Sequence, residues 1–349
     1  MNLLNPGLIV AALAVMPSSA IHSPKGFPSP RPHTGHLESL SPVFDALVDP
    51  DAKIETLADG FDWSEGPVWI ADGGYLLFSD IPPNNIWKWS EVDGLSLYLH
   101  PSGYTGTTGR GGEVGSNGLT LDARGRLVLC QHGDRRIARM THPVSHPQPE
   151  YETLAATWQG RRFNSPNDLV YHPTGDLYFT DPAYGLEGRM EDPAKEIGFQ
   201  GVYRLSTDGV VTLLTDEMTR PNGLAFSPDA RTLYISNSDG GDLAVWRAYD
   251  VQPDGTLANG RTFASAAALK RPGRTGSPDG LKVDVSGNLF ATGPGGVLVF
   301  SPQGVHLGTI VTGQPTSNCA WGDDGHTLYM TADMLLLRIR LKTRGPGFR

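Results

Sequence analysis

Apolar and polar positions alternate along most of the chain from about residue 44 onward, in short runs bounded by Gly, Pro, Asn and Asp. A period of two is the pattern of a half-buried strand, and the 3.6-residue period of an amphipathic helix is nearly absent. The bounding residues are those that turns require. The pattern therefore predicts an all-β protein of many short strands.

One unit of this pattern recurs six times. Each copy has a small polar residue or Pro, an Asn-Gly or Asp-Gly type pair, an alternating strand, a turn and a second strand. The copies begin roughly 40 to 57 positions apart, at Glu65, Ser116, Pro166, Pro221, Pro278 and Ser317. This spacing is typical of propeller blades with insertions of variable length. We predict a six-bladed β-propeller over residues 44–349.

Each copy continues into a third strand, and an extra strand precedes the first copy. The third strands are expected at residues 85–89, 136–140, 201–205, 243–249, 296–300 and 335–341. The extra strand, at 53–57, is expected to complete the last blade, because closing the ring removes exposed sheet edges.

Each copy holds two turn signals with different meanings. The second, such as Asp122 to Gly125, is interpreted as the hairpin between the first two strands. The first lies where the chain enters the innermost strand, so the equivalent residues should converge around the axis. Taken singly, such a pair indicates only a turn. The convergent ring comprises Glu65, offset by about one position, Asn117, Asn167, Asn222, Asp279 and Asn318.

Up to six side-chain oxygens in one small space predict a bound cation. Two carboxylates with neutral amides, and no His or Cys, are donors for a hard divalent ion. A site assembled from several loops suits the larger and geometrically tolerant Ca²⁺, which we predict. Mg²⁺, Mn²⁺ and Zn²⁺ stay open as alternatives.

Composition narrows the partners. The formal net charge is −9 and no dense basic run occurs, which argues against nucleic acid and favours a small molecule or a cation. Cys130 and Cys319 have no paired spacing, so we expect free buried thiols. No serine-hydrolase elbow, zinc-protease motif or phosphate-binding loop is present.

The N-terminal region lacks the repeat. Residues 1–20 contain an apolar stretch and end in Ser-Ser-Ala, and no basic residue precedes the stretch. We interpret them as a secretory signal peptide, which predicts a periplasmic or secreted protein. The alternative is a disordered or weakly membrane-associated N-terminus, with the protein otherwise cytoplasmic. Residues 21–43, rich in Pro, Ser and His, are predicted to be a disordered linker. No later segment has the length of a membrane span.

A Gly-rich stretch, residues 101–115, leads into the second ring position and should lie over the channel mouth. It carries Tyr104, Arg110 and Glu113, and both a substrate lid and a merely flexible loop fit it. His132 ends a second strand, where it could shuttle protons or serve only as a structural histidine.

At these residues the sequence resembles the gluconolactonase family, which includes regucalcin and, more distantly, diisopropyl fluorophosphatase. The resemblance runs from about residue 53 to 341. It is carried by E-G-P-V-W at 65–69, R-G-G-E at 110–113, R-F-N-S-P-N-D at 162–168, T-D-P-A-Y-G at 180–185, P-N-G-L at 221–224 and S-P-D-G at 277–280. It implies a propeller whose metal ligands are Glu65, Asn167, Asn222 and Asp279, and hydrolysis of a sugar lactone such as glucono-1,5-lactone to gluconate.

Roles within such a site follow as hypotheses. The cation would polarise the lactone carbonyl, with water attacking directly and Asp279 or Glu65 as general base. Asp168 would orient the ligand. The residues expected to contact substrate are Tyr104, Arg110, Glu113, Asn117, His132 and Tyr184.

Two rival functions keep the fold. One is a non-catalytic Ca²⁺-binding propeller that binds a ligand or protein, and the other is an aryl-ester or organophosphate hydrolase using the same site. For the lactonase and for the aryl-ester or organophosphate hydrolase alike, we expect a small-molecule substrate, no stable membrane span, and a monomer or homodimer.

Overall fold

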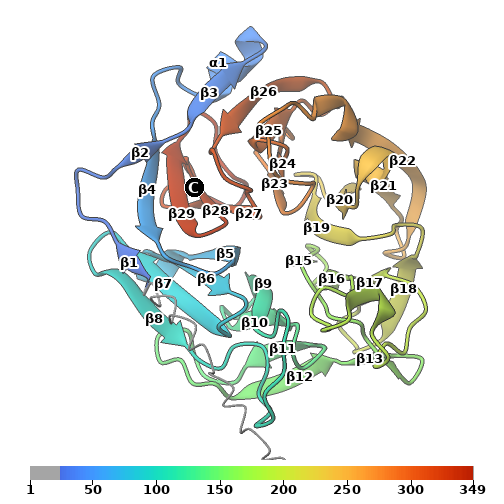
Figure 1. Ribbon diagram of the computed structural model, residues 1–349. Coiled ribbons are helices and arrows are strands. Elements are labelled where there is room, and N and C mark those ends of the chain that lie inside the picture. The colour runs from blue at the N-terminus through green and yellow to red at the C-terminus, as the bar shows by residue number, and fades with distance from the viewer. Residues whose placement is uncertain (1–23, 349) are drawn as a thin grey trace, which may run out of the picture.

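The computed structural model describes residues 24–348 and is a β-propeller of six blades around a central axis (Figure 1). In each blade the strands are antiparallel, and the first strand of the repeat lies next to the axis. This confirms the predicted fold and blade number.

The first three blades follow the chain in order. Blade 1 is β5 (Ser64–Ile70), β6 (Tyr75–Asp80), β7 (Asn85–Ser90) and β8 (Gly94–Leu99). Blade 2 is β9 (Ser116–Leu121), β10 (Leu127–Gln131), β11 (Arg136–Met140) and β12 (Tyr151–Ala155). Blade 3 is β15 (Leu169–Tyr171), β16 (Leu177–Asp181), β17 (Gly201–Leu205) and β18 (Val211–Thr215). A separate hairpin, β13 (Thr157–Trp158) and β14 (Arg161–Arg162), lies between blades 2 and 3 in the sequence.

The other three blades continue in the same way. Blade 4 is β19 (Pro221–Phe226), β20 (Thr232–Ser238), β21 (Ala244–Val251) and β22 (Leu257–Ser265). Blade 5 is β23 (Leu281–Val283), β24 (Leu289–Gly293), β25 (Gly296–Phe300) and β26 (His306–Val311). Blade 6 is β27 (Asn318–Gly322), β28 (Thr327–Ala332), β29 (Leu335–Arg340) and β4 (Ile54–Asp59). All six predicted third strands are present.

The ring closes in blade 6, as predicted. Strand β4, blue in Figure 1, pairs with β29 at the red end of the chain, with Leu337 opposite Thr56. The two ends of the domain thus share one sheet, which leaves no open edge between the first and last blades.

The core consists of apolar clusters, several of which join neighbouring blades. Between blades 5 and 6, for example, Phe290, Leu328 and Leu337 are fully buried in one cluster. Since each blade has an apolar face that only its neighbour can cover, the ring as a whole is the cooperative unit.

The segment before the first blade differs from the predicted disordered linker. Strands β1 (Lys25–Gly26) and β2 (His33–Thr34) pair with β4, and β3 (His36–Ser39) adds a fifth strand to blade 5 beside β26. Helix α1 (Pro42–Leu47) follows and buries Phe44 in the blade 5–6 cluster. These strands are too short to show a periodic pattern in the sequence. Their pairing depends on the outer edges of β4 and β26, which only the folded structure provides. The proposed signal, residues 1–20, lies outside the described residues.

Cys130 and Cys319 are both buried and free, as expected. None of the helices in residues 24–348 has both the length and the apolar character needed to cross a membrane.

Candidate functional site

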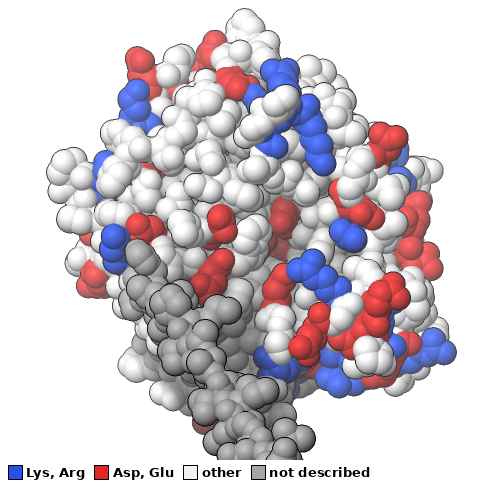
Figure 2. All heavy atoms as spheres, viewed as in Figure 1, with Lys and Arg blue, Asp and Glu red and all other residues white. Residues whose placement is uncertain are grey.

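A cavity of about 420 Å³ opens on the axis at one face of the propeller. Five of the six ring residues line it, and acidic side chains lie in the hollow at the centre of this face (Figure 2). Its full lining is Trp63, Glu65, Glu113, Asn117, Asn167, Tyr184, Arg189, Asn222, Ser238, Gly276, Ser277, Asp279, Pro315 and Thr316. The structure therefore brings together the four predicted ligands and three of the predicted substrate contacts.

Polar side chains at the ends of the second strands of three blades accept hydrogen bonds from the backbone just before the ring residues. Asp80 Oδ1 accepts hydrogen bonds from the backbone N–H groups of Asp62 and Trp63, both at 3.0 Å. Asn237 Oδ1 likewise accepts the Arg220 N–H at 2.7 Å. Asp181 does the same in blade 3, through the amides of residues 164 and 165. In each case one bonded amide lies two residues before a ring residue, so the ring side chain starts from a fixed backbone.

In blades 1, 3 and 4 the residue before this polar side chain carries a hydroxyl group that bonds to the next blade. Ser79 donates to the carbonyl oxygen of Asn117 at 2.8 Å, and Thr180 donates to that of Asn222 at 2.7 Å. Ser236 donates to the Asp279 carbonyl at 2.7 Å. Blade 2 has the buried Cys130 at this position. These bonds fix the carbonyl groups of three ring residues without engaging their side chains.

The glycines after the ring residues serve close packing. A Cβ on Gly66, Gly118 or Gly223 would lie 2.0, 2.8 or 2.4 Å from the ring carbonyl oxygen of the next blade. Only Gly66 of these three has a positive φ, of 54°. In these three repeats the glycine of the first signal is thus a steric requirement of the ring, since only glycine lets adjacent inner strands approach this closely.

Burial strongly perturbs the two ring carboxylates. Burial, and after it the charge of Asp168, raise the pKa of Glu65 to about 7. Burial also raises the pKa of Asp279 well above its usual range, and Glu65 adds to that shift. Glu65 Oε2 accepts hydrogen bonds from the Gly66 N–H and from Asn318 Nδ2, at 2.6 and 3.0 Å. Both shifts favour the neutral acids unless a cation compensates the negative charge.

Three oxygen atoms of the ring have no partner. Within residues 24–348, Asn117 Oδ1, Asn167 Oδ1 and Asp279 Oδ1 are buried and accept no hydrogen bond. Buried polar atoms are normally satisfied, so such a group around one cavity indicates a binding site for a ligand or cation. No group of three or more His, Cys, Asp or Glu side chains placed for a metal occurs in the described part of the chain. The ring relies on amide oxygens as well as carboxylates.

Two predicted residues lie away from this cavity. Asn318 points from its ring position toward Glu65, and both Asn318 and Asp168 line a different cavity, at the opposite mouth of the axis. Asp168 Oδ1 accepts the N–H of Leu169 at 2.8 Å. The structure does not place Asp168 where it could touch a ligand in the first cavity.

Three predicted substrate contacts also lie outside the cavity. Arg110 donates to the carbonyl oxygens of Gly133 and Gly185 and stacks over Tyr104 at 5.5 Å. His132 is fully buried, and burial lowers its pKa to about 3, so its ring is neutral.

Sequence reasoning missed several lining and supporting residues. Trp63 and Arg189 line the cavity, and Asp80, Asp181 and Asn237 support it. A signal existed for the supporting set, because the second strands end in Ser-Asp, Thr-Asp and Ser-Asn at corresponding positions of three repeats.

A six-bladed propeller with a polar, oxygen-lined axial cavity is the class that fold and site define. Residues 63–333 match the family described as SMP-30/gluconolactonase/LRE-like region, and the chain belongs to that family. It is similar to a gluconolactonase from Zymomonas mobilis, with 41% identity over 317 residues, covering 89% of this chain and 87% of the relative.

Solved structures agree with this assignment. A gluconolactonase from Xanthomonas campestris superposes with a TM-score of 0.74 at 32% identity, covering 89% of this chain and 98% of the other. A calcium-binding protein, regucalcin, from Agrobacterium tumefaciens superposes with a TM-score of 0.63 over 83% of this chain and 94% of the other. At 18% identity the latter likeness shows the fold alone.

Proposed function

We propose that this protein is a metal-dependent lactonase that hydrolyses a sugar lactone such as glucono-1,5-lactone. The observation that carries the proposal is the set of unpartnered oxygens of Asn117, Asn167 and Asp279 around a cavity that also holds Glu65. The gluconolactonases among its relatives support the choice of substrate.

The donor set fits a hard divalent cation. Glu65, Asn167, Asn222 and Asp279 would hold it, and all four supply oxygen only. Ca²⁺ tolerates mixed carboxylate and amide ligands in irregular geometry, which favours it over Mg²⁺. The raised pKa values of Glu65 and Asp279 give a second reason, because a bound cation would favour their charged forms. When bound, the ion would supply Lewis-acid polarisation of the lactone carbonyl.

The remaining chemistry belongs to side chains of the cavity. Asp279, which lines the cavity, would accept the proton of the attacking water as general base. Burial raises the pKa of Tyr184 to about 12, so its hydroxyl stays protonated and can donate a hydrogen bond to a substrate oxygen. Asn117 and Arg189 add further polar groups to the wall, which suits a substrate rich in hydroxyls.

Stripping and restoring the ion tests this function. Hydrolysis of glucono-1,5-lactone, followed by acid release and corrected for the spontaneous reaction, should be lost on chelation and return with Ca²⁺. Glu65→Gln should need a higher Ca²⁺ concentration for the same activity and the same rise in melting temperature.

Three outcomes separate the rival functions. A melting temperature that responds to Ca²⁺ without any turnover would leave a non-catalytic propeller. Faster turnover of an aryl ester or organophosphate than of the sugar lactone would replace the substrate class. Activity unaffected by chelation would contradict the metal.

A further inference from the structure

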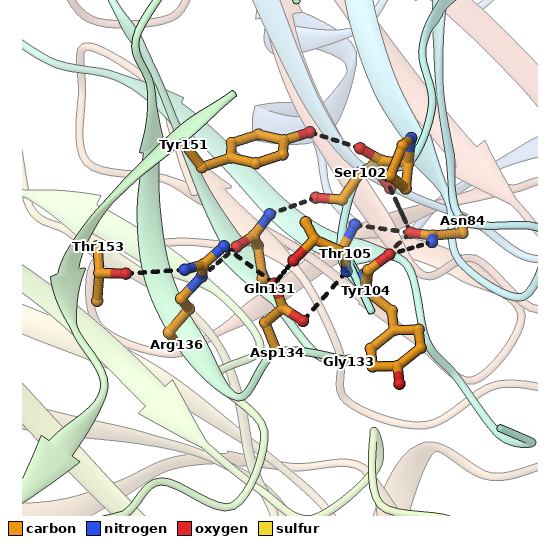
Figure 3. Close-up of polar contacts among 12 residues, drawn as sticks. Asn84, Ser102, Tyr104, Thr105, Gln131, Gly133, Asp134, Arg136, Tyr151 and Thr153 are labelled. Carbon is orange, nitrogen blue, oxygen red and sulfur yellow. Dashed lines mark hydrogen bonds and ion pairs between the residues drawn. The ribbon is translucent and has the colours of Figure 1, made fainter. Parts of the chain in front are cut away.

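The Gly-rich segment 101–115, here called the lid loop, is held by hydrogen bonds at both ends, and Figure 3 shows those at its start. At its start, Asn84 Oδ1 accepts hydrogen bonds from the backbone N–H groups of Ser102, Gly103 and Tyr104, and Gln131 Nε2 donates to the Ser102 carbonyl at 2.8 Å. At its end, the Gly115 N–H donates to the Ile81 carbonyl at 2.9 Å. The lid loop therefore has a defined path over blade 2.

Arg110 fixes the middle of the lid loop. Its guanidinium donates to the carbonyl of Gly133, at 2.7 Å, and to that of Gly185, which lie in blades 2 and 3. These bonds occupy Arg110 outside the cavity. They hold the chain three residues before Glu113, whose side chain does line the cavity.

Within the described part of the chain, the Glu113 side chain makes no hydrogen bond that would stabilise the fold. Among residues 24–348 its oxygens accept no hydrogen bond, and the basic side chains nearest to them are His132, with Nδ1 at 3.7 Å, and Arg189, with Nη2 at 3.8 Å. His132 is neutral and Arg189 is largely exposed, so neither fully compensates a charge on Glu113. Tyr184 and Asp279 face it from the other elements around the cavity.

This environment favours the protonated acid. Desolvation raises the pKa of Glu113 to about 7, against a smaller opposing effect of Arg189. A carboxylic acid that is still partly protonated at neutral pH can donate a proton to a reacting oxygen.

Resting on the lactonase function above, we propose that Glu113 is the catalytic acid that protonates the ring oxygen as it leaves. Water adds to the carbonyl carbon and gives its proton to Asp279. The bond from that carbon to the ring oxygen then breaks, its electron pair stays on the oxygen, and the oxygen takes the proton of Glu113. The new carboxylic acid and Asp279 each release a proton to solvent, and solvent returns one proton to Glu113.

The leaving group provides the test. An alkoxide, as from glucono-1,5-lactone, needs a proton when it departs, whereas the phenolate from the aryl lactone dihydrocoumarin does not. Glu113→Gln should lower kcat for glucono-1,5-lactone by about 100-fold, within the usual range for proton transfer, and lower kcat for dihydrocoumarin by less than about 3-fold. Glu187→Gln, an exposed carboxylate beside the lid loop, is the matched control and should leave both rates unchanged.

A pH profile gives an independent readout. In the wild type, kcat for the sugar lactone should fall as pH rises through about 7, because Glu113 loses its proton, and Glu113→Gln should lack this decrease. An unchanged melting temperature and Ca²⁺ response would show that the variant is folded and holds the ion.

Other outcomes would overturn the assignment. Equal losses on both lactones, no loss on either, or a raised KM for the sugar lactone at unchanged kcat would each show that Glu113 does not protonate the leaving oxygen. If the wild type does not turn over dihydrocoumarin, an unaltered pH profile in Glu113→Gln overturns it. A wild type inactive on both lactones would instead refute the lactonase function itself.

Discussion

The two mouths of the propeller axis are built from the same inner strands yet differ in character. One holds the oxygen-lined cavity with Glu65, Asn117 and Asp279. The other, about 510 Å³, is walled largely by apolar side chains, among them Trp69, Phe226, Trp321 and Phe348 from the C-terminal end. Within residues 24–348, only the first mouth combines backbone fixed by buried acceptors with side-chain oxygens that are left unpaired.

This difference shows which end of the inner strands can form a binding site. Side chains at the entry of an inner strand can be held rigidly, because the preceding loop and the neighbouring blade both bond to its backbone. Farther along the same strands the residues pack against each other and need no such support. Rigid placement with unsatisfied polar atoms is what a binding site requires.

The largest effect should come from Asp279. Asp279→Asn keeps the shape but removes the charge, so it should lower kcat for glucono-1,5-lactone by roughly 1,000-fold. Phe348→Ala at the opposite mouth should change kcat by less than about 2-fold. Steady-state rates corrected for spontaneous hydrolysis check both. Full activity in Asp279→Asn would remove Asp279 from both its proposed roles.

The second effect tests the packing of the ring. Gly223→Ala places a Cβ 2.4 Å from the Asp279 carbonyl oxygen and should lower the free energy of unfolding by about 3 kcal/mol. Gly240→Ala, in blade 4 with nothing within 4 Å of its added Cβ, should change it by less than about 0.5 kcal/mol. Urea denaturation measures the difference, and equal values for the two variants would contradict a steric role for the ring glycine.

A third pair compares the two mouths directly. Asn237→Ala removes the acceptor of the Arg220 N–H and should cost about 2 kcal/mol of stability and also lower kcat, because Asn222 loses its fixed backbone. Asn288→Ala removes a buried asparagine of the β23–β24 hairpin, bonded to Asp284 at 2.8 Å, and should cost stability without changing kcat. A loss of kcat in Asn288→Ala as well would mean that the mouths are coupled.

The smallest effect depends on pH. Burial raises the pKa of Asp80 to about 6, above the usual 3.8, so the folded protein binds this proton more tightly than the unfolded chain. The resulting stability is present below about pH 4 and is lost as pH rises through about 6, a change on the order of 2 kcal/mol. Asp80→Asn keeps an oxygen for the two backbone N–H groups and should flatten this part of the stability profile in urea titrations. If Asp80→Asn leaves the dependence of the unfolding free energy on pH unchanged, that dependence comes from other groups.

The sequence by itself determined the propeller. Strand alternation, six repeats and the early strand at residues 53–57 predicted the blades and their closure, because these features are local and each blade repeats them. The ring residues also followed, since equivalent positions in a closed ring must converge.

Only the tertiary structure decided what surrounds that ring. Strands β1 to β3 pair with β4 and β26 through edges that the sequence does not reveal, so residues 25–39 are ordered. Asn318 and Asp168 belong to the other mouth, Arg110 bonds to two carbonyls instead of facing the cavity, and Glu113 alone of the lid loop lines it. The direction of a side chain depends on contacts between blades that are far apart in the chain, and those contacts exist only once the ring has closed.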